Sequence, residues 1–236
     1  MRRLGLLIPS LVIISLTAAA QRRVAADVEV KTLYGGKVTT VNSKVFCSSS
    51  GHMVQVFDSP DTYYTITNPN GEFKLYFPST NEVYSERMED YSDRDDLLYL
   101  FLSGRSDDMG LGLYGYKLSS TSKEEGGLLK RTYLPMGPGK GVSKVELVME
   151  NYLPIYLAYY DSSGAVVSRT YLSSYSRFSN LMLPLRVTSV QYTAKKDSSL
   201  VRTVYSNVRT DGSDPMFDFK VPADAKPVKA APTGKK

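Results

Sequence analysis

Cysteine, histidine and tryptophan are almost missing from this sequence, which has one cysteine, Cys47, one histidine, His52, and no tryptophan. A single cysteine excludes an internal disulfide bond, and one histidine with one cysteine cannot form a typical zinc site. A Ser-His-Asp triad would have to use His52, and no serine lies in the strand-turn-helix pattern that exposes such a nucleophile. We therefore expect no catalytic residues, no metal and no cofactor.

Two alternatives to this reading stay open. A pair of carboxylates could still cleave a glycan, although the missing tryptophan removes the ring on which sugars commonly stack. Cys47 is expected to be buried as a small apolar side chain, and the alternative is a reactive or intermolecularly paired thiol.

The N-terminal apolar run is too short to span a membrane. Arg2 and Arg3 precede it, it covers residues 4–16, and the small residues Thr17 to Ala20 follow. A spanning helix needs roughly 20 apolar residues, whereas this three-part pattern is typical of a secretory signal peptide. The sequence thus predicts a signal peptide at 1–20 and export to the periplasm, with a membrane anchor as the alternative. No cysteine follows the small residues, so the protein should not carry a lipid anchor of its own.

The excess of positive charge is confined to the ends of the chain. Six of the 29 Lys and Arg residues lie in the first 20 residues or after Ala225, whereas all 24 Asp and Glu residues lie between Asp27 and Asp224. The body is therefore about neutral and lacks the basic surface that nucleic acids require. We expect one domain at 21–225 and a disordered basic tail at 226–236, because the tail has no apolar face to bury.

Alternation of apolar and polar residues with a period of two dominates the body. It is clearest in residues 72–77, 144–150 and 217–221, and turn signals such as Asn70-Gly71 and Ser163-Gly164 lie between such stretches. The pattern predicts a long antiparallel meander, with further strands at 37–48, 53–57, 63–67, 114–118, 128–134, 154–160, 166–171, 183–193 and 200–208.

One segment has the pattern of a helix instead. Ser92 or Asp93 is a candidate N-cap, Gly104 a candidate C-terminal cap, and residues 97–102 between them are apolar all round. A helix of that kind is buried on most sides, so we expect residues 94–103 to lie against the concave side of a curved sheet. A second short turn is expected between Asp107 and Gly112. Gly104, Gly110 and Gly112 are interpreted as caps, and a hinge is the alternative.

The alternation also indicates which side chains line the apolar interior. The odd-numbered residues of the strands 72–77 and 144–150 should face the apolar interior, because side chains of a strand alternate between its two faces. The helix should contribute four residues to the same interior, and the strand 155–160 is apolar on both faces. The candidate ligand-binding residues are Phe73, Leu75, Phe77, Leu97, Leu98, Phe101, Leu102, Val145, Leu147, Met149, Ile155 and Leu157.

Several motifs, taken in order, resemble the periplasmic lipoprotein-carrier family, LolA and its LolA-like relatives. The likeness is carried by residues 64–84 with Asn70-Gly71, Tyr76-Phe77-Pro78 and Asn81-Glu82-Val83, by the helix and residues 108–111, by 144–147 and 154–156, and by 184–187 and 217–222. The segment between Ala20 and Lys31 is short for the N-terminal helix usual in that family.

The resemblance implies a half-open antiparallel β-barrel of about ten or eleven strands, with short helices plugging its concave face. It also implies a monomeric periplasmic carrier that binds the acyl chains of lipoproteins or other lipids in an apolar cavity. Such a carrier would receive them from an inner-membrane exporter and pass them to an outer-membrane acceptor. The alternative is a non-enzymatic envelope scaffold or assembly protein that uses the same fold to bind a protein partner.

Overall fold

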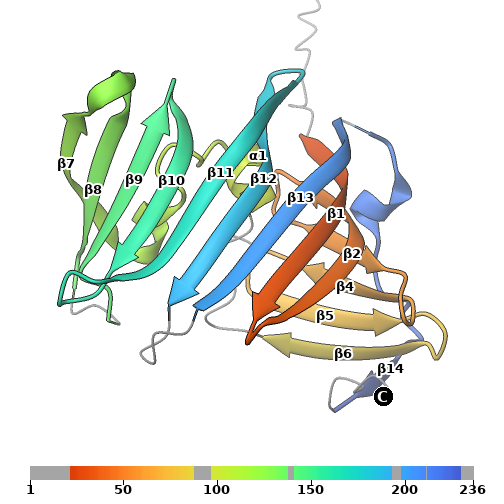
Figure 1. The fold of residues 1–236 in the computed structure, drawn as a ribbon. Helices are drawn as coiled ribbons and strands as arrows, with labels where there is room; N and C mark the ends of the chain where they lie inside the picture. The colour runs from red at the N-terminus through yellow and green to blue at the C-terminus, as the bar shows by residue number, and fades with distance from the viewer. Residues whose placement is uncertain (1–21, 88–96, 138–140, 193–197, 211, 230–236) are drawn as a thin grey trace, which may run out of the picture.

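One open sheet of fourteen strands makes up most of the molecule (Figure 1). The structure is a computed structural model, and it describes residues 22–87, 97–137, 141–192, 198–210 and 212–229. The strand order is β14-β6-β5-β4-β3-β2-β1-β13-β12-β11-β10-β9-β8-β7, and all neighbours are antiparallel except β14 and β6. The strands are β1 (Arg23–Tyr34), β2 (Lys37–Ser48), β3 (Met53–Phe57), β4 (Tyr63–Thr67), β5 (Glu72–Phe77), β6 (Glu82–Arg87), β7 (Tyr116–Lys123), β8 (Leu129–Pro135), β9 (Lys144–Glu150), β10 (Leu153–Tyr160), β11 (Val166–Phe178), β12 (Leu181–Tyr192), β13 (Ser198–Thr210) and β14 (Lys226–Val228).

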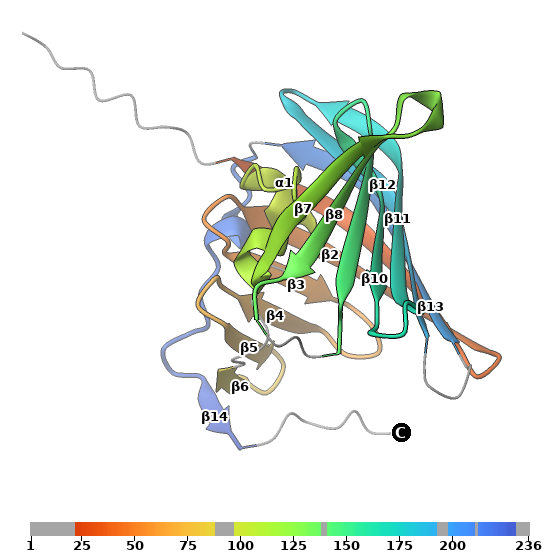
Figure 2. The same ribbon diagram turned by 90° about the vertical axis from the view of Figure 1, so that its left-hand side faces the viewer.

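The sheet curves without closing. In Figure 2, β7–β13 form one wall, β2–β6 form the other, and the helix α1 (Leu97–Leu102) lies between them. The 3-10 turn η2 (Leu111–Tyr114) follows on the same side; η3 (Glu125–Gly127) and η4 (Pro215–Asp218) lie in later loops. The half-open antiparallel barrel expected from the sequence is therefore confirmed, with more strands than expected.

Three strands, β1, β6 and β14, were not expected from the sequence. β1 pairs with β2 over its whole length and with β13 on its other side, so it joins the two walls. It includes most of the segment between Ala20 and Lys31, which is short for the N-terminal helix usual in the LolA-like family. Its alternation of Ala26, Val28 and Val30 with Asp27, Glu29 and Lys31 is a strand signal of the same kind as those in the rest of the chain.

The C-terminal segment differs from its expected structure in two places. Residues 217–221 do not form a strand, because Pro215 starts the turn η4 and the Asp214 carboxylate accepts the N–H of Met216 at 3.0 Å. The tail that was expected to be disordered from residue 226 onward begins with a strand, because β14 pairs with β6. Residues 230–236 lie outside the described residues.

The buried side chains form two clusters, one on each face of the sheet. The larger cluster lies on the concave face and includes the side chains of α1, Leu111 and the inward residues of β9 to β12. The smaller cluster lies on the other face of β2 to β5, where Phe217 packs edge-on against Phe46 at 5.6 Å between ring centroids. The C-terminal segment thus covers the convex side, and the concave side contains the helix.

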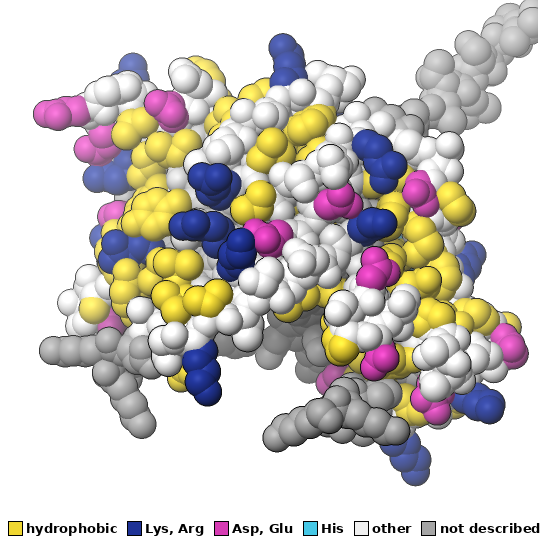
Figure 3. Space-filling view, turned by 45° about the vertical axis from the view of Figure 1, so that its right-hand side comes forward, with side chains coloured by type: hydrophobic (Ala, Val, Ile, Leu, Met, Phe, Trp, Pro, Cys, Tyr) yellow, Lys and Arg dark blue, Asp and Glu magenta, His cyan; other side chains and the backbone are white. Residues whose placement is uncertain are grey.

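Within the residues that the structure describes, no helix has the length and apolar character needed to cross a membrane. On the face seen in Figure 3, side chains of both charge signs are interspersed with apolar and neutral ones.

Candidate functional site

The concave face brings together most of the residues that the alternation placed there. Val145, Leu147 and Met149 on β9 are at most 2% exposed, and Leu157 on β10 lies opposite Leu147. On α1, Leu98, Phe101 and Leu102 are buried in the same cluster, and Leu97 packs against it partly exposed. The helix α1 lies against β12, β1 and β2, and its side chains share one cluster with Leu111 and the inward residues of β9 to β12.

The opposite wall is apolar but less covered. Phe73, Leu75 and Phe77 are each half-buried. Phe73 lies opposite Thr67, which lies opposite Met53 of the concave cluster, so the three odd-numbered residues of β5 face the concave side. Lys74 and Tyr76 face the other way, and Tyr76 belongs to the convex cluster. The expected register of this strand is present.

Ile155 is the exception among the candidate residues. The pairing of β10 with β9 shifts between Pro154 and Tyr156, so Ile155 sits at a bulge. The bulge places both Pro154 and Leu157 in buried positions and leaves Ile155 half-buried outside both clusters. Strict alternation cannot foresee this, because one inserted residue reverses the faces of those that follow.

Sequence reasoning missed an aromatic group on the less covered wall. The ring of Phe57 on β3 stacks on that of Tyr63 on β4 with centroids 4.5 Å apart, and Tyr63 lies 6.0 Å from Phe77 on β5. Burial raises the pKa of Tyr63 above its usual value of 10.0. The three rings extend the apolar surface of Phe73 and Leu75 to the end of these strands, and their strand positions gave the only signal for them.

The buried helix α1 is followed by a short segment that contains three glycines, Gly104, Gly110 and Gly112. Gly104 has a φ of 73° and its N–H bonds to the carbonyl of Phe101, as expected of a helix cap. The Asp108 carboxylate then accepts the N–H groups of Gly110 and Gly112 at 2.8 and 3.1 Å, which fixes the turn before η2. The candidate N-caps Ser92 and Asp93, and the first residues of the expected helix, lie outside the described residues.

The side chains gathered on the concave face are mostly apolar. Cys47, which is buried there, belongs to the same cluster as α1. Among the described residues no three His, Cys, Asp or Glu side chains come together as ligands for a metal ion. The arrangement can exclude water from an apolar molecule, and it offers that molecule few polar contacts.

Comparison with known proteins places this fold among LolA-like structures. No protein-family model and no curated protein matches the sequence. Solved structures do match: a DUF1329 family protein from Desulfovibrio piger (TM-score 0.57, 16% identity, covering 84% of this chain and 90% of that one). A LolA superfamily protein from Nitrosomonas europaea has a TM-score of 0.53 at 10% identity, covering 79% and 85%. An outer membrane lipoprotein-sorting protein domain from Vibrio parahaemolyticus has a TM-score of 0.53 at 14% identity, covering 83% and 89%. At these identities the likeness concerns the fold, and it confirms the resemblance seen in the sequence motifs.

Proposed function

We propose that this protein is a periplasmic carrier that binds the acyl chains of a lipoprotein, or of another lipid, against its concave face. The observation that carries the proposal is the apolar concave face, on which the described part of α1 packs against β12, β1 and β2. Phe73, Leu75 and Phe77 on the other wall are half-buried beside it. Acyl chains would extend over this wall and displace the helix from part of the other.

The physical need for such a carrier is the cost of exposing an acyl chain to water. Each methylene kept out of water contributes about 0.8 kcal/mol, so a lipid-modified protein cannot cross an aqueous compartment unaided. A binding surface made of apolar side chains supplies this energy without fixing the chain in one position, which also permits release. The proposal includes export by the N-terminal segment, binding without catalysis, and exchange with an inner-membrane exporter and an outer-membrane acceptor.

A titration with acyl chains of increasing length tests this function. Unlabelled fatty acids and lysolipids would displace a fluorescent fatty acid from the purified mature protein. Each added methylene should strengthen binding by up to about fourfold, which corresponds to about 0.8 kcal/mol. Moderate salt should have little effect because the body is about neutral. Equal displacement by short and long chains would rule out acyl binding on this face.

A second candidate function is a scaffold that holds a protein partner, and one observation favours it. Leu98, Leu102 and Leu147 are at most 2% exposed, so the side chains of α1 already fill the space over one wall. If this packing is permanent, the helix is a core element and the acyl titration will show no dependence on chain length. Crosslinking in intact cells would then identify the protein partner.

A further inference from the structure

The outer edge of strand β2 is paired over only part of its length. On one side β2 pairs with β1 from Lys37 to Ser48, but on the other side β3 pairs only with residues 44–47. In the described part of the chain no strand pairs with the outer edge of residues 38–43. This stretch belongs to the β1–β2 hairpin, which extends beyond the end of β3.

The geometry of the hairpin decides which backbone groups face outward. The two-residue turn Gly35-Gly36 makes Tyr34 and Lys37 the first pair, and in such a turn this pair is hydrogen-bonded to each other. Every second residue from Lys37 therefore bonds to β1. The N–H and C=O groups of Val38, Thr40 and Asn42 point to the open side.

The sequence of this edge lacks the features that usually protect one. Residues 38–43 (Val-Thr-Thr-Val-Asn-Ser) contain no charge, proline or glycine, and Val38 and Val41 are 64% and 44% exposed. By contrast, the outermost strand β7 carries Lys117 and Lys123 and a bulge, and β14 has only three residues. Sheet edges that avoid pairing carry such charges and bulges, so the edge of β2 is suited to receiving a strand.

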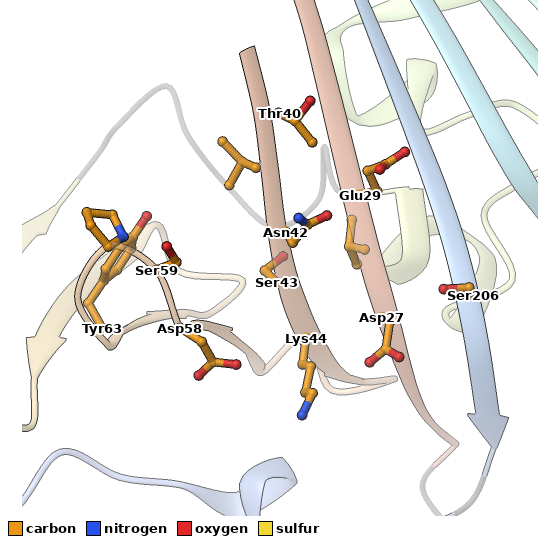
Figure 4. Close-up of a pocket in the computed structure, with 13 residues that line it drawn as sticks. Asp27, Glu29, Thr40, Asn42, Ser43, Lys44, Asp58, Ser59, Tyr63 and Ser206 are labelled. Atoms are coloured by element: carbon orange, nitrogen blue, oxygen red, sulfur yellow. The ribbon is translucent and has the colours of Figure 1, made fainter.

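A groove runs along this edge. Its volume is about 660 Å³, with β2 as one side and the loop from Asp58 to Pro60, together with Tyr63, as the other (Figure 4).

The charges of the groove are mainly negative. Three carboxylates, those of Asp27, Glu29 and Asp58, face it together with one ammonium group, that of Lys44. Asp27 accepts a hydrogen bond from the Asn207 amide at 2.6 Å, and Glu29 pairs with Lys31 at the surface. Among the described residues Asp58 has no ion pair, so its charge is available to a ligand.

We propose that this groove binds an extended, basic segment of a partner protein, which adds to the sheet as a strand beside residues 38–43 of β2. Backbone hydrogen bonds to Val38, Thr40 and Asn42 supply the attachment. Lysine or arginine side chains of the added strand lie near Asp27, Glu29 and Asp58, and its alternate apolar side chains lie near Val41 and Tyr63 on the other face. The groove shares Tyr63 with the less covered concave wall, but this proposal does not depend on the function proposed for that wall.

Binding of a labelled peptide of alternating lysine and valine, measured by fluorescence anisotropy, tests the proposal. Two N-methylated forms of the peptide each block one alternate set of its N–H groups. At least one form should bind about tenfold more weakly or worse, because it cannot pair with β2. A peptide of alternating glutamate and valine should also bind more weakly. Equal binding of the parent and both methylated forms would overturn strand addition.

Substitutions in β2 test the location. Thr40→Pro removes one outward N–H without breaking a bond to β1, whereas Thr40→Val keeps that N–H. Thr40→Pro should weaken peptide binding about tenfold, and Thr40→Val should not. Asp58→Asn should lower the affinity for the peptide, and the affinity of this variant should depend less on salt concentration. If the Thr40→Pro variant binds the peptide as the wild type does, the site is elsewhere. Thermal unfolding shows whether this variant is folded, and if it is not, the methylated peptides test the proposal on the wild-type protein.

The groove could instead be occupied by a second copy of this chain or by the chain's own C-terminal tail, and the same measurements distinguish these occupants from a partner protein. A dimer in solution that dissociates on Thr40→Pro would mean that the edge pairs with a second copy of this chain, which overturns the proposal. Truncation after Val228 removes the basic residues Lys229, Lys235 and Lys236. If truncation strengthens peptide binding, the protein's own tail fills the groove and a partner segment is not its occupant.

Discussion

The ring of Phe101 on α1 lies against the ring of Tyr175 on β11, with the two centroids 6.2 Å apart. The Tyr175 hydroxyl donates a hydrogen bond to the carbonyl of Pro154 on β10, and burial raises the pKa of that hydroxyl. The hydroxyl therefore holds the Tyr175 ring in place beneath the helix. This contact is a direct link between α1 and the wall that it covers, so its strength bears on whether the helix can move.

Truncation of Phe101 tests whether α1 competes with a ligand for the concave face. Phe101 is 4% exposed, so Phe101→Ala should lower the free energy of unfolding by about 3–5 kcal/mol. If acyl chains displace α1, the weakened helix should also raise the affinity for a fatty-acid probe. Phe101→Leu is the control, with smaller effects of both kinds. The full loss of stability with unchanged affinity would identify α1 as a fixed part of the core.

A carboxylate on the less covered wall should block acyl binding. Leu75 is half-buried and faces the concave side, so Leu75→Glu would place a charge where methylenes are expected to lie. We expect affinity for a long-chain probe to fall about tenfold or more, since burial of an unpaired charge is costly. Leu134→Glu on the convex side of β8 is the matched control and should bind normally. Equal binding by the two variants would place the ligand elsewhere.

His52 should make the protein less stable in mild acid. Burial lowers the pKa of His52 from its ordinary value of 6.5, and a hydrogen bond with the backbone of Phe219 only partly offsets this. The unfolded chain then binds more protons than the folded one as the pH falls through 6.5 toward the folded pKa. Stability is fully present above 6.5 and declines below it.

Urea unfolding above and below pH 6.5 measures this effect, and His52→Gln should remove that part of the pH dependence. Because His52 is the only histidine, its proton resonances also give the folded pKa directly. A folded pKa at or above 6.5 would contradict the expectation.

Gly51 is expected to tolerate no side chain. Its φ is +83°, and a Cβ there would lie 2.2 Å from Pro69 Cγ and 3.1 Å from the Tyr99 ring on α1. Gly51→Ala should therefore cost about 1–3 kcal/mol more than Gly36→Ala. Gly36 has a similar φ of +74° but open space around it, so it isolates the backbone strain. Equal losses in thermal or urea unfolding would show that the turn can shift away from the clash.

Cys47 can report on movement of α1. Its thiol is buried in the cluster that contains the helix, so the native protein should react with a thiol reagent far more slowly than the unfolded chain. If α1 lifts locally, the reaction should proceed through an opening that small amounts of urea hardly affect. Reaction only through global unfolding would argue against a movable helix.

Much of the fold could be predicted from single strands. The bounds expected for residues 37–48, 53–57, 63–67, 72–77 and 144–150 are those of β2, β3, β4, β5 and β9. In residues 72–77 and 144–150 every odd-numbered residue is apolar, and turn residues such as Asn70-Gly71 separate several of these segments, so local pattern and tertiary environment agree. The signal peptide at 1–20 falls outside the described residues and stays a prediction.

The errors fall where tertiary contacts or turn chemistry decide the conformation. Residues 217–221 alternate like a strand, but Phe217 and Phe219 pack on the convex face from a turn that Pro215 and Asp214 initiate. Ile155 left the expected face because of a bulge in the pairing with β9. Neither feature has a signal in the period of the hydrophobic residues.

The sequence by itself determined that the chain forms a curved antiparallel sheet with one apolar helix, because the period of two and the all-round apolar segment can bury their side chains in few other ways. Only the tertiary structure decided how that interior is shared. It placed α1 against β12, β1 and β2, left Phe57, Tyr63 and Phe77 half-buried, and ended β3 short of the β2 edge. These features depend on contacts between residues far apart in the chain, and a pattern of neighbouring residues carries no information about such contacts.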